Sequence, residues 1–108
     1  MKPSKYRNQR VEFDGLHFDS KAERDYYQGL LWREKAGEVR DIRLQPAFPI
    51  IVNGVKVATY KADFQFTECA TGEDIVADKK SPITRKNPTY RLKKKLVEAL
   101  YHIQVREV

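Results

Sequence analysis

Two stretches of the chain repeat apolar residues at the spacing of an α-helix. The first runs from about Ser20 to Ala36 and is followed by Gly37, and the second runs from about Thr89 to His102. Their apolar stripes are Ala22, Tyr26, Tyr27, Leu30 and Leu31, and Leu92, Leu96, Val97, Leu100 and Tyr101. We expect the aromatic residues of these stripes, and Trp32 beside them, to pack in the core rather than to stack on bases.

The other apolar residues follow the pattern of β-strands. Strands are predicted at Val39–Leu44, Phe48–Val52, Lys56–Phe66 and Ile75–Lys80, with a last strand in Ile103–Val108. Asp14-Gly15 within Val11–Phe18, and Asn53-Gly54 further on, predict two hairpins, and Thr71-Gly72 predicts another turn. Ser81–Pro88 contains two prolines and is predicted to be a loop. Hairpin, helix, strands, helix and strand in this order predict an α/β (α+β) fold.

Length and charge narrow the class of protein. A chain of 108 residues forms one domain, which we place at 11–108 after a basic arm at 1–10. The net charge is +6, and the cations are clustered rather than evenly spread, which favours DNA or another polyanion as the partner. The clusters are Lys2, Lys5, Arg7 and Arg10, and Lys79, Lys80, Arg85, Lys86, Arg91, Lys93, Lys94 and Lys95. The alternative is a solvated surface that only keeps the protein soluble.

Cysteine usage and hydropathy exclude several classes. Cys69 is the only cysteine, so an intramolecular disulfide and a cysteine-rich zinc site are both excluded. No apolar run approaches the length of a membrane span, and the basic N-terminal segment lacks the apolar stretch of a secretory signal. We therefore expect a cytoplasmic protein without a membrane partner.

Charged residues interrupt two of the predicted strands, where burial favours apolar side chains. Asp63 lies near the end of one strand, and Asp78 and Lys80 lie two residues apart on the next. Because side chains alternate along a strand, Asp78 and Lys80 point to one face and Lys79 to the other. The spacing alone is not decisive, since Asp19-Ser20-Lys21 repeats it. The position after an apolar strand makes the second triplet the better candidate.

The chemistry that suits these side chains is metal-assisted cleavage of a phosphodiester. Mg²⁺ prefers carboxylate and phosphate oxygens and is often bound by only one or two acids. The metal activates a bound water and neutralises charge on the phosphate, while a lysine orients the water or stabilises the transition state. This reaction needs no serine, cysteine or histidine nucleophile, which agrees with a chain whose only histidines, His17 and His102, lie in no recognisable motif.

Five segments carry a resemblance to a known family. They are Phe18-Asp19-Ser20-Lys21-Ala22-Glu23, Leu44-Gln45-Pro46, Ala62-Asp63-Phe64, Asp78-Lys79-Lys80 and Tyr90-Arg91-Leu92-Lys93-Lys94-Lys95-Leu96. Together they resemble a small phage and prophage family of PD-(D/E)XK nucleases, over nearly the whole chain after Arg10. The superfamily includes restriction endonucleases, transposition endonuclease subunits and phage Holliday-junction resolvases.

The resemblance implies a restriction-endonuclease-like core, with a mixed central sheet of four to five strands flanked by two helices. It implies a catalytic site of Glu23, Asp63, Asp78 and Lys80, in which the three acids hold one or two Mg²⁺ that Mn²⁺ can replace. Gln45 would line the site. With Gln45, the predicted DNA-binding residues are Lys79, Arg85, Lys86, Arg91, Lys93, Lys94 and Lys95. The chain departs from the family pattern at Ala77, where an acid is usual, and at Lys79, where an apolar residue is usual.

Each site residue also has a structural explanation. Glu23 follows Ser20 at capping-box spacing. Asp63 can form a salt bridge with Lys61 or Lys80, and Asp78 with Lys80 can be an ordinary pair on an edge strand. The basic residues of the second helix can be a solvated face.

Three functions follow from the sequence. The leading hypothesis is a Mg²⁺-dependent endodeoxyribonuclease of the kind that cuts branched DNA, such as Holliday junctions, in phage recombination. Because a junction needs two symmetric cuts, this hypothesis predicts a homodimer. The second is a non-catalytic, basic nucleic-acid-binding module or regulatory subunit, which the absence of an acid at Ala77 favours. The third is a nicking or restriction-like subunit that needs another protein for recognition.

Overall fold

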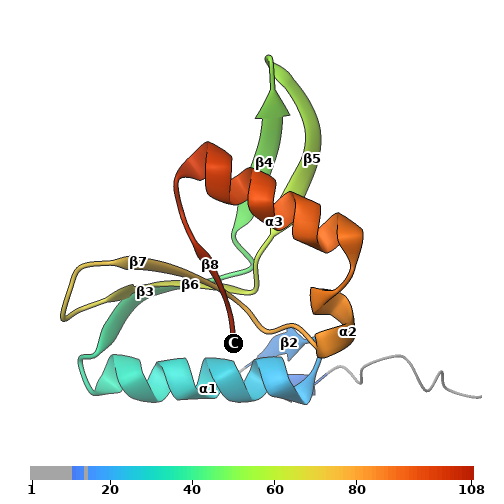
Figure 1. Ribbon diagram of the computed structural model, residues 1–108. Helices are drawn as coiled ribbons and strands as arrows, with labels where there is room; N and C mark the ends of the chain where they lie inside the picture. The colour runs from blue at the N-terminus through green and yellow to red at the C-terminus, as the bar shows by residue number, and fades with distance from the viewer. Residues whose placement is uncertain (1–10, 14) are drawn as a thin grey trace, which may run out of the picture.

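The computed structural model of the chain describes residues 11–13 and 15–108. The arm at 1–10 and Asp14 of the predicted first turn lie outside the described residues. The helices are α1 (Lys21–Lys35), α2 (Pro82–Arg85) and α3 (Pro88–Tyr101). The strands are β1 (Val11–Phe13), β2 (Leu16–Phe18), β3 (Val39–Leu44), β4 (Ala47–Val52), β5 (Val55–Lys61), β6 (Phe64–Glu68), β7 (Asp74–Asp78) and β8 (Val105–Glu107). Figure 1 shows their arrangement.

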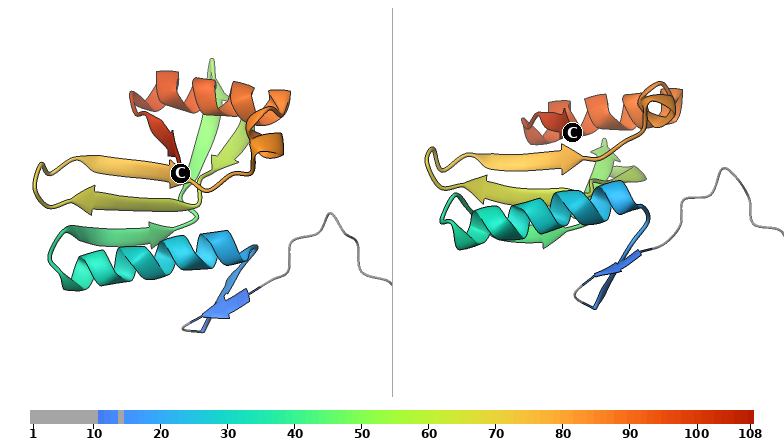
Figure 2. Two further views of the ribbon diagram at one scale, coloured as in Figure 1. Left: turned by 60° about the horizontal axis from the view of Figure 1, so that its bottom comes forward. Right: turned by 90° about the horizontal axis from the view of Figure 1, so that it is seen from below.

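A four-stranded sheet in the order β3-β6-β7-β8 forms the centre of the fold. The β3–β6 and β6–β7 pairs are antiparallel, whereas β7 and β8 run parallel and are joined through α2 and α3. The helices α1 and α3 lie on opposite faces of this sheet (Figure 2). The predicted α/β class with a mixed sheet of four strands is confirmed. β1 and β2 pair separately as the expected N-terminal hairpin.

The strands β3 to β6 form one long hairpin that is bent in the middle. β3 pairs with β6 and β4 pairs with β5, and the two ladders meet at Gln45-Pro46 on one side and Ala62-Asp63 on the other. Two backbone hydrogen bonds hold this junction, from Gln45 N–H to Asp63 O (3.0 Å) and from Ala62 N–H to Pro46 O (3.1 Å). Beyond the bend, β4 and β5 rise away from the sheet (Figure 1).

The bend corrects one prediction, because Lys56–Phe66 is two strands rather than one. Asp63 consequently lies immediately before β6 instead of at the end of a strand. Gln45 adopts a left-handed backbone with φ 52°, which is uncommon for a residue with a side chain. The sequence carries no signal for the bend, because every second residue stays apolar and buried through it, at Tyr60, Ala62, Phe64 and Phe66.

Two apolar clusters occupy the two faces of the sheet. On the α1 side, Tyr27 and Leu30 pack with residues that include Phe64, Phe66 and Ala77. The cluster on the α3 side contains Val76, Val97 and Val105, together with Phe48, Ile50, Tyr60 and Ala62 around the bend. Because Val76 and Ala77 alternate, β7 is buried from both sides, as the apolar run before Asp78 predicts.

Side chains cap the start of both long helices. Ser20 Oγ accepts the N–H of Glu23 (3.2 Å) at the start of α1, and Asn87 Oδ1 accepts the N–H of Tyr90 (3.0 Å) at the start of α3. Pro88 occupies the first turn of α3, where its missing N–H costs little. α3 ends at Tyr101 and is followed by the C-cap residue His102, which has a left-handed φ of 56°.

Two further predictions are wrong. The segment Ser81–Pro88 is not only a loop, since Ser81 caps the one-turn helix α2, so the described residues contain three helices rather than two. Trp32 is 65% exposed rather than part of the core, and Tyr101 is also exposed, although its ring touches Phe48 and its hydroxyl donates to Pro49 O. None of the helices in the described residues has the length and apolar character needed to cross a membrane.

Candidate active site

The antiparallel β6–β7 pair brings Asp63 and Asp78 together. Phe64 and Ala77 are partners at the end of the ladder, so the next residues outward are the two acids. The N–H of Asp63 donates to Asp78 Oδ1 (2.9 Å), and the N–H of Lys79 donates to Asp63 Oδ2 (2.7 Å). Each carboxylate is thus fixed by a backbone amide from the opposite side, which sets the distance between them.

Lys80 completes the pair. Its Nζ lies 3.6 Å from Asp63 Oδ1 and 3.7 Å from Asp78 Oδ1, so the two carboxylates share one ammonium. The Lys80 side chain is 23% exposed, which leaves it accessible from solvent. β7 is an interior strand between β6 and β8, and Asp78 is 0% exposed. The alternative of an ordinary edge-strand pair is therefore excluded for Asp78 and Lys80.

Sequence reasoning missed Tyr60. This side chain lies on β5, is only 3% exposed, and donates its hydroxyl hydrogen bond to Asp78 Oδ2. Both oxygens of Asp78 therefore have a donor within the protein. A buried tyrosine in an apolar strand predicts a core residue, and only the bend between β5 and β6 turns its hydroxyl toward the acid.

Burial dominates the electrostatics of the acids. Desolvation raises the pKa of Asp63 above its usual value, although Lys80 and the N–H of Lys79 oppose the rise. Desolvation likewise raises the pKa of Asp78, against the effect of Lys80 and of the Asp63 amide. A second cation beside the pair would lower both pKa values, because one ammonium does not balance the charge of two largely buried carboxylates.

Glu23 belongs to the same electrostatic environment. Desolvation first, and then the negative charges of Asp63 and Asp19, raise the pKa of Glu23 to about 7. Its carboxylate lines a cavity of about 200 Å³ with Asp63 and Gln45, and a second one of about 430 Å³ with Lys79 and Lys80. Within the described part of the chain, no hydrogen bond returns from this carboxylate to the backbone of Ser20, so only half of a capping box is formed.

The donor set fits Mg²⁺ through two acids. Among the described residues, no three acidic, histidine or cysteine side chains come close enough to hold a metal together, so Glu23 does not join Asp63 and Asp78 as a preformed third ligand. Mg²⁺ keeps several waters and is commonly held by one or two carboxylates with substrate phosphates. Asp63 and Asp78 satisfy that requirement, since each oxygen that accepts a hydrogen bond retains a further lone pair.

The chain matches the family described as "Protein of unknown function (DUF1064)" over residues 3–107, which is nearly its whole length. It belongs to this family. No curated protein and no solved structure matches it.

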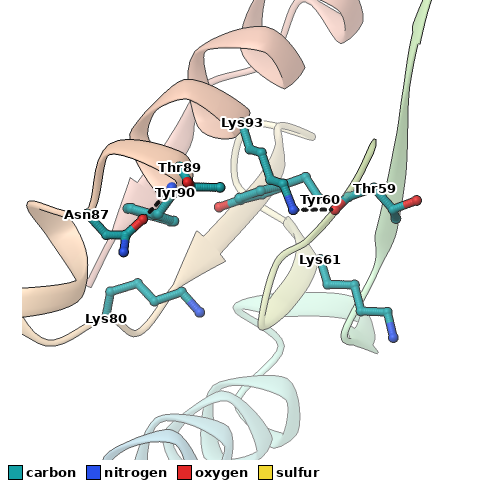
Figure 3. Close-up of a pocket in the computed structure, with 8 residues that line it drawn as sticks. All are labelled: Thr59, Tyr60, Lys61, Lys80, Asn87, Thr89, Tyr90 and Lys93. Carbon is teal, nitrogen blue, oxygen red and sulfur yellow. Dashed lines mark hydrogen bonds between the residues drawn. The ribbon is translucent and has the colours of Figure 1, made fainter. Parts of the chain in front are cut away.

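The predicted DNA-binding residues of the DUF1064 protein fall on two surfaces. Arg85, Arg91, Lys94 and Lys95 line a groove of about 340 Å³ together with Glu107. Lys93 faces the other way, toward β5, and shares a cavity of about 430 Å³ with Lys80 and Lys61 (Figure 3). Lys86 is exposed at the end of α2. Lys79 is half-buried, and its backbone N–H donates a hydrogen bond to the Asp63 carboxylate.

Ala77, where the resembling family usually has an acid, lies on the opposite face of the sheet from Asp78. Ala77 is fully buried in the cluster beneath α1, whereas Asp78 points to the α3 side, where Tyr60 lies. A carboxylate at position 77 would be directed away from Asp78 and toward α1. Glu23, in the first turn of α1, lies on that side and lines a cavity with Asp63.

Proposed function

We propose that this DUF1064 protein is a Mg²⁺-dependent endodeoxyribonuclease that hydrolyses DNA phosphodiester bonds. The observation that supports this most strongly is the convergence of Asp63, Asp78 and Lys80 at one end of β6 and β7, where one ammonium lies within 4 Å of both carboxylates. Buried acids with raised pKa values next to an accessible cavity are typical of functional sites. The same arrangement supports membership of the PD-(D/E)XK nucleases.

Each residue has a role in this proposal. Asp63 and Asp78 would hold Mg²⁺, or Mn²⁺ in its place, which when bound activates water and neutralises charge on the phosphate. The Lys80 ammonium stabilises negative charge on the phosphate oxygens during attack. Glu23, with a pKa of about 7, is suited to accept a proton from the attacking water near neutral pH.

The charged surface supports DNA as the substrate. The groove of Arg85, Arg91, Lys94 and Lys95 can follow a phosphate backbone without reading sequence. In this proposal the protein acts in the cytoplasm, that of the host if a phage encodes it. It cuts branched DNA such as a Holliday junction during recombination, and it works as a homodimer because two symmetric cuts are needed.

A non-catalytic binding module is the second candidate. Two observations favour it: both Asp78 oxygens already accept hydrogen bonds from the protein, and the described residues hold no three-ligand metal cluster. Such a protein would keep the basic groove and bind DNA without cleaving it. A subunit that cuts only with a partner protein is the third candidate. A DNA-cutting assay with and without cell extract separates it from the second.

The deciding experiment uses purified full-length protein with supercoiled plasmid and a synthetic four-way junction. We expect cutting in Mg²⁺ or Mn²⁺, none with EDTA, and none from Lys80→Ala in any of these buffers. Lys56→Ala, which removes a lysine from β5 far along the hairpin, is the matched control and should cut normally. Absence of metal-dependent cutting by the wild type, with DNA binding intact, would replace the nuclease by the binding module.

A further inference from the structure

A cavity of about 430 Å³ lies beside the acid pair, between the β4–β5 hairpin and α3. Thr59, Tyr60 and Lys61 of β5 form one wall, and Asn87, Thr89, Tyr90 and Lys93 of α3 and its cap form the other, with Lys80 between them (Figure 3). Its volume is in the range of sites that hold one small molecule or one nucleotide. Lys80 belongs both to this cavity and to the acid pair, so a ligand here touches the candidate active site.

The two tyrosines present ring surface rather than free hydroxyls. The hydroxyl of Tyr60 is bonded to Asp78, and that of Tyr90 donates to Glu107 (2.8 Å). Their rings lie 6.3 Å apart and are tilted against each other, so the hydrogen bonds and the ring contact fix both. Since Tyr60 is almost fully buried, Tyr90 is the ring that a ligand in the cavity meets. A fixed aromatic ring binds a nucleobase by stacking.

Cations are placed for the phosphates on either side of such a base. Lys93 reaches across the cavity, and its Nζ contacts Thr59 O at 3.5 Å, a long hydrogen bond that is easily exchanged for a phosphate oxygen. Lys80 extends from the α2 side toward the space below Tyr60 and Tyr90, and the ammonium of Lys61 points away from the other labelled side chains (Figure 3). A single strand that passes over Lys80 thus meets a second ammonium at Lys93.

From these contacts we propose that the cavity binds one unpaired nucleotide next to the phosphate held at Lys80. Bases inside a duplex have both faces covered by their neighbours, so only an unstacked base can pack against Tyr90. The proposal rests on the proposed nuclease function and narrows its substrate to DNA with an unpaired nucleotide at the cleavage point. Single strands, flaps, branch points that leave a nucleotide unpaired, and the stretches that supercoiling opens in a plasmid meet this requirement, and relaxed continuous duplex does not.

The test measures binding without cleavage, by fluorescence anisotropy in EDTA with a labelled single-stranded 12-mer, a flap and a duplex of the same sequence. Wild-type protein should bind the first two about tenfold or more tightly than the duplex. Lys93→Gln should weaken single-strand binding about fivefold and lower the salt dependence by about one phosphate contact. Lys56→Gln, which removes the same charge from an exposed position of β5, should change binding less than twofold.

Stacking has its own pair of variants. Tyr90→Leu should weaken single-strand binding about tenfold, whereas Tyr90→Phe keeps the ring and should stay within about twofold of the wild type. Inorganic phosphate and the dinucleotide pTpT serve as small probes. Chemical-shift changes at Tyr90 with pTpT, but not with phosphate at equal concentration, are expected if the base is recognised. Equal shifts with both would reduce the cavity to a phosphate site and overturn the proposal.

The outcomes separate this inference from the proposed function. Equal affinity for single strand and duplex, or equal effects of Lys93→Gln and Lys56→Gln, would overturn the nucleotide site even if the protein cuts DNA in Mg²⁺. Selective binding of the single strand that depends on Lys93 and Tyr90, without any metal-dependent cutting, would keep the nucleotide site and reject the nuclease. A leucine at position 90 also removes the ring contact with Tyr60. A loss of binding in Tyr90→Leu therefore supports the nucleotide site only when Lys93→Gln weakens binding as well.

Discussion

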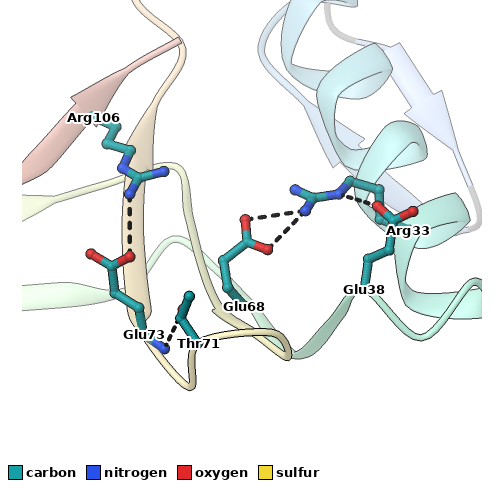
Figure 4. Close-up of polar contacts among 6 residues, drawn as sticks. All are labelled: Arg33, Glu38, Glu68, Thr71, Glu73 and Arg106. Atoms are coloured by element: carbon teal, nitrogen blue, oxygen red, sulfur yellow. Dashed lines mark hydrogen bonds and ion pairs between the residues drawn. The ribbon is translucent and has the colours of Figure 1, made fainter.

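The hairpin of β6 and β7 carries a cluster of acids and bases at each end, and the two clusters differ in how far their charges are exposed to water. At the turn end, Glu68 and Glu73 face Arg33 of α1 and Arg106 of β8 (Figure 4). Arg33 donates to Glu38 (2.9 Å) and through one nitrogen to both oxygens of Glu68 (2.8 and 3.1 Å). Hydrogen bonds to Glu38 and Glu68 raise the pKa of Arg33.

Acids outnumber bases at both ends, since Arg33 and Arg106 face Glu38, Glu68 and Glu73, but at the open end the excess of negative charge is buried. Asp63 and Asp78 share one ammonium, and Glu23 adds a third carboxylate whose pKa is about 7. The turn end holds its ions near water, where each pair costs little to form and contributes little. Stability alone favours exposed charges such as those at the turn end. The buried excess of acid at the open end is therefore typical of a site that binds a cation or a proton.

Exchange of the central acid gives the largest expected effect. Asp78→Asn keeps the shape of the side chain and both hydrogen bonds, because its oxygen accepts from Asp63 N–H and its amide donates to the Tyr60 oxygen. We expect DNA cleavage in Mg²⁺ to fall at least about 100-fold, with DNA binding unchanged or stronger. Gel assays of cutting and anisotropy measure the two effects.

The matched control for that variant is Glu68→Gln at the other end of the same hairpin. It removes the same charge from a carboxylate that also accepts two hydrogen bonds. Cleavage should remain within about twofold of the wild type, since a surface ion pair at this distance does not act on the reaction. Equal losses in the two variants would mean that the hairpin needs its charges only for folding.

Tyr60→Phe tests whether the position of Asp78 matters and should have the next largest effect. The variant keeps the buried ring and removes one hydrogen bond to a carboxylate, so cleavage should fall about tenfold or more, as for other residues that orient metal ligands. The apparent Mg²⁺ requirement should rise with it. A purely structural role would lower the melting temperature and leave the Mg²⁺ dependence of the remaining activity unchanged.

How far the sequence predicts this site depends on the range of the interactions. The alternation of apolar residues is local, and it places β3, β4 and β7 close to their observed positions. The closeness of Asp63 and Asp78 was a hypothesis from their places on two consecutive predicted strands and from the family resemblance, and the register of the β6–β7 ladder now accounts for it. Glu23 was implied only by resemblance, because a first-turn glutamate after a serine is equally well explained as a cap.

The bend at Gln45-Pro46 and Ala62-Asp63 could not be predicted in the same way. It depends on hydrogen bonds between residues far apart in the chain, and it decides that Tyr60 reaches Asp78 and that β5 faces α3. The exposure of Trp32 has a different cause. Neighbouring residues of a helix face different directions, and in α1 only Tyr27 and Leu30 are buried against the sheet.

The charge of Glu23 should make stability depend on pH. Its pKa is 4.5 for an ordinary glutamate and about 7 in the folded chain, so the folded state holds the proton more tightly than the unfolded chain. Its contribution is therefore fully present below pH 4.5 and is lost as the pH rises through about 7. Because the side chain is only half-buried, we expect this loss to be about 1–2 kcal/mol.

Glu23→Gln, which carries no charge at any pH, should lose about that much less stability between pH 5 and pH 8 than the wild type. Urea unfolding in EDTA at the two pH values measures the difference. Glu34→Gln removes an exposed carboxylate from the same helix and is the control. Parallel curves for wild type and Glu23→Gln would show that the carboxylate is as well solvated as one on the surface.

Loss of the turn-end cluster should have the smallest effect and should be of the opposite kind. Arg33→Met keeps most of the apolar stem of the side chain and removes a guanidinium that is 40% exposed. We expect the free energy of unfolding to fall by only about 0.5–1 kcal/mol, with the loss shrinking in high salt, because water and ions screen exposed pairs. Cleavage and DNA binding should not change. A loss that salt does not reduce would mean that Arg33 acts through packing, and a loss of cleavage would join the two ends of the hairpin into one functional unit.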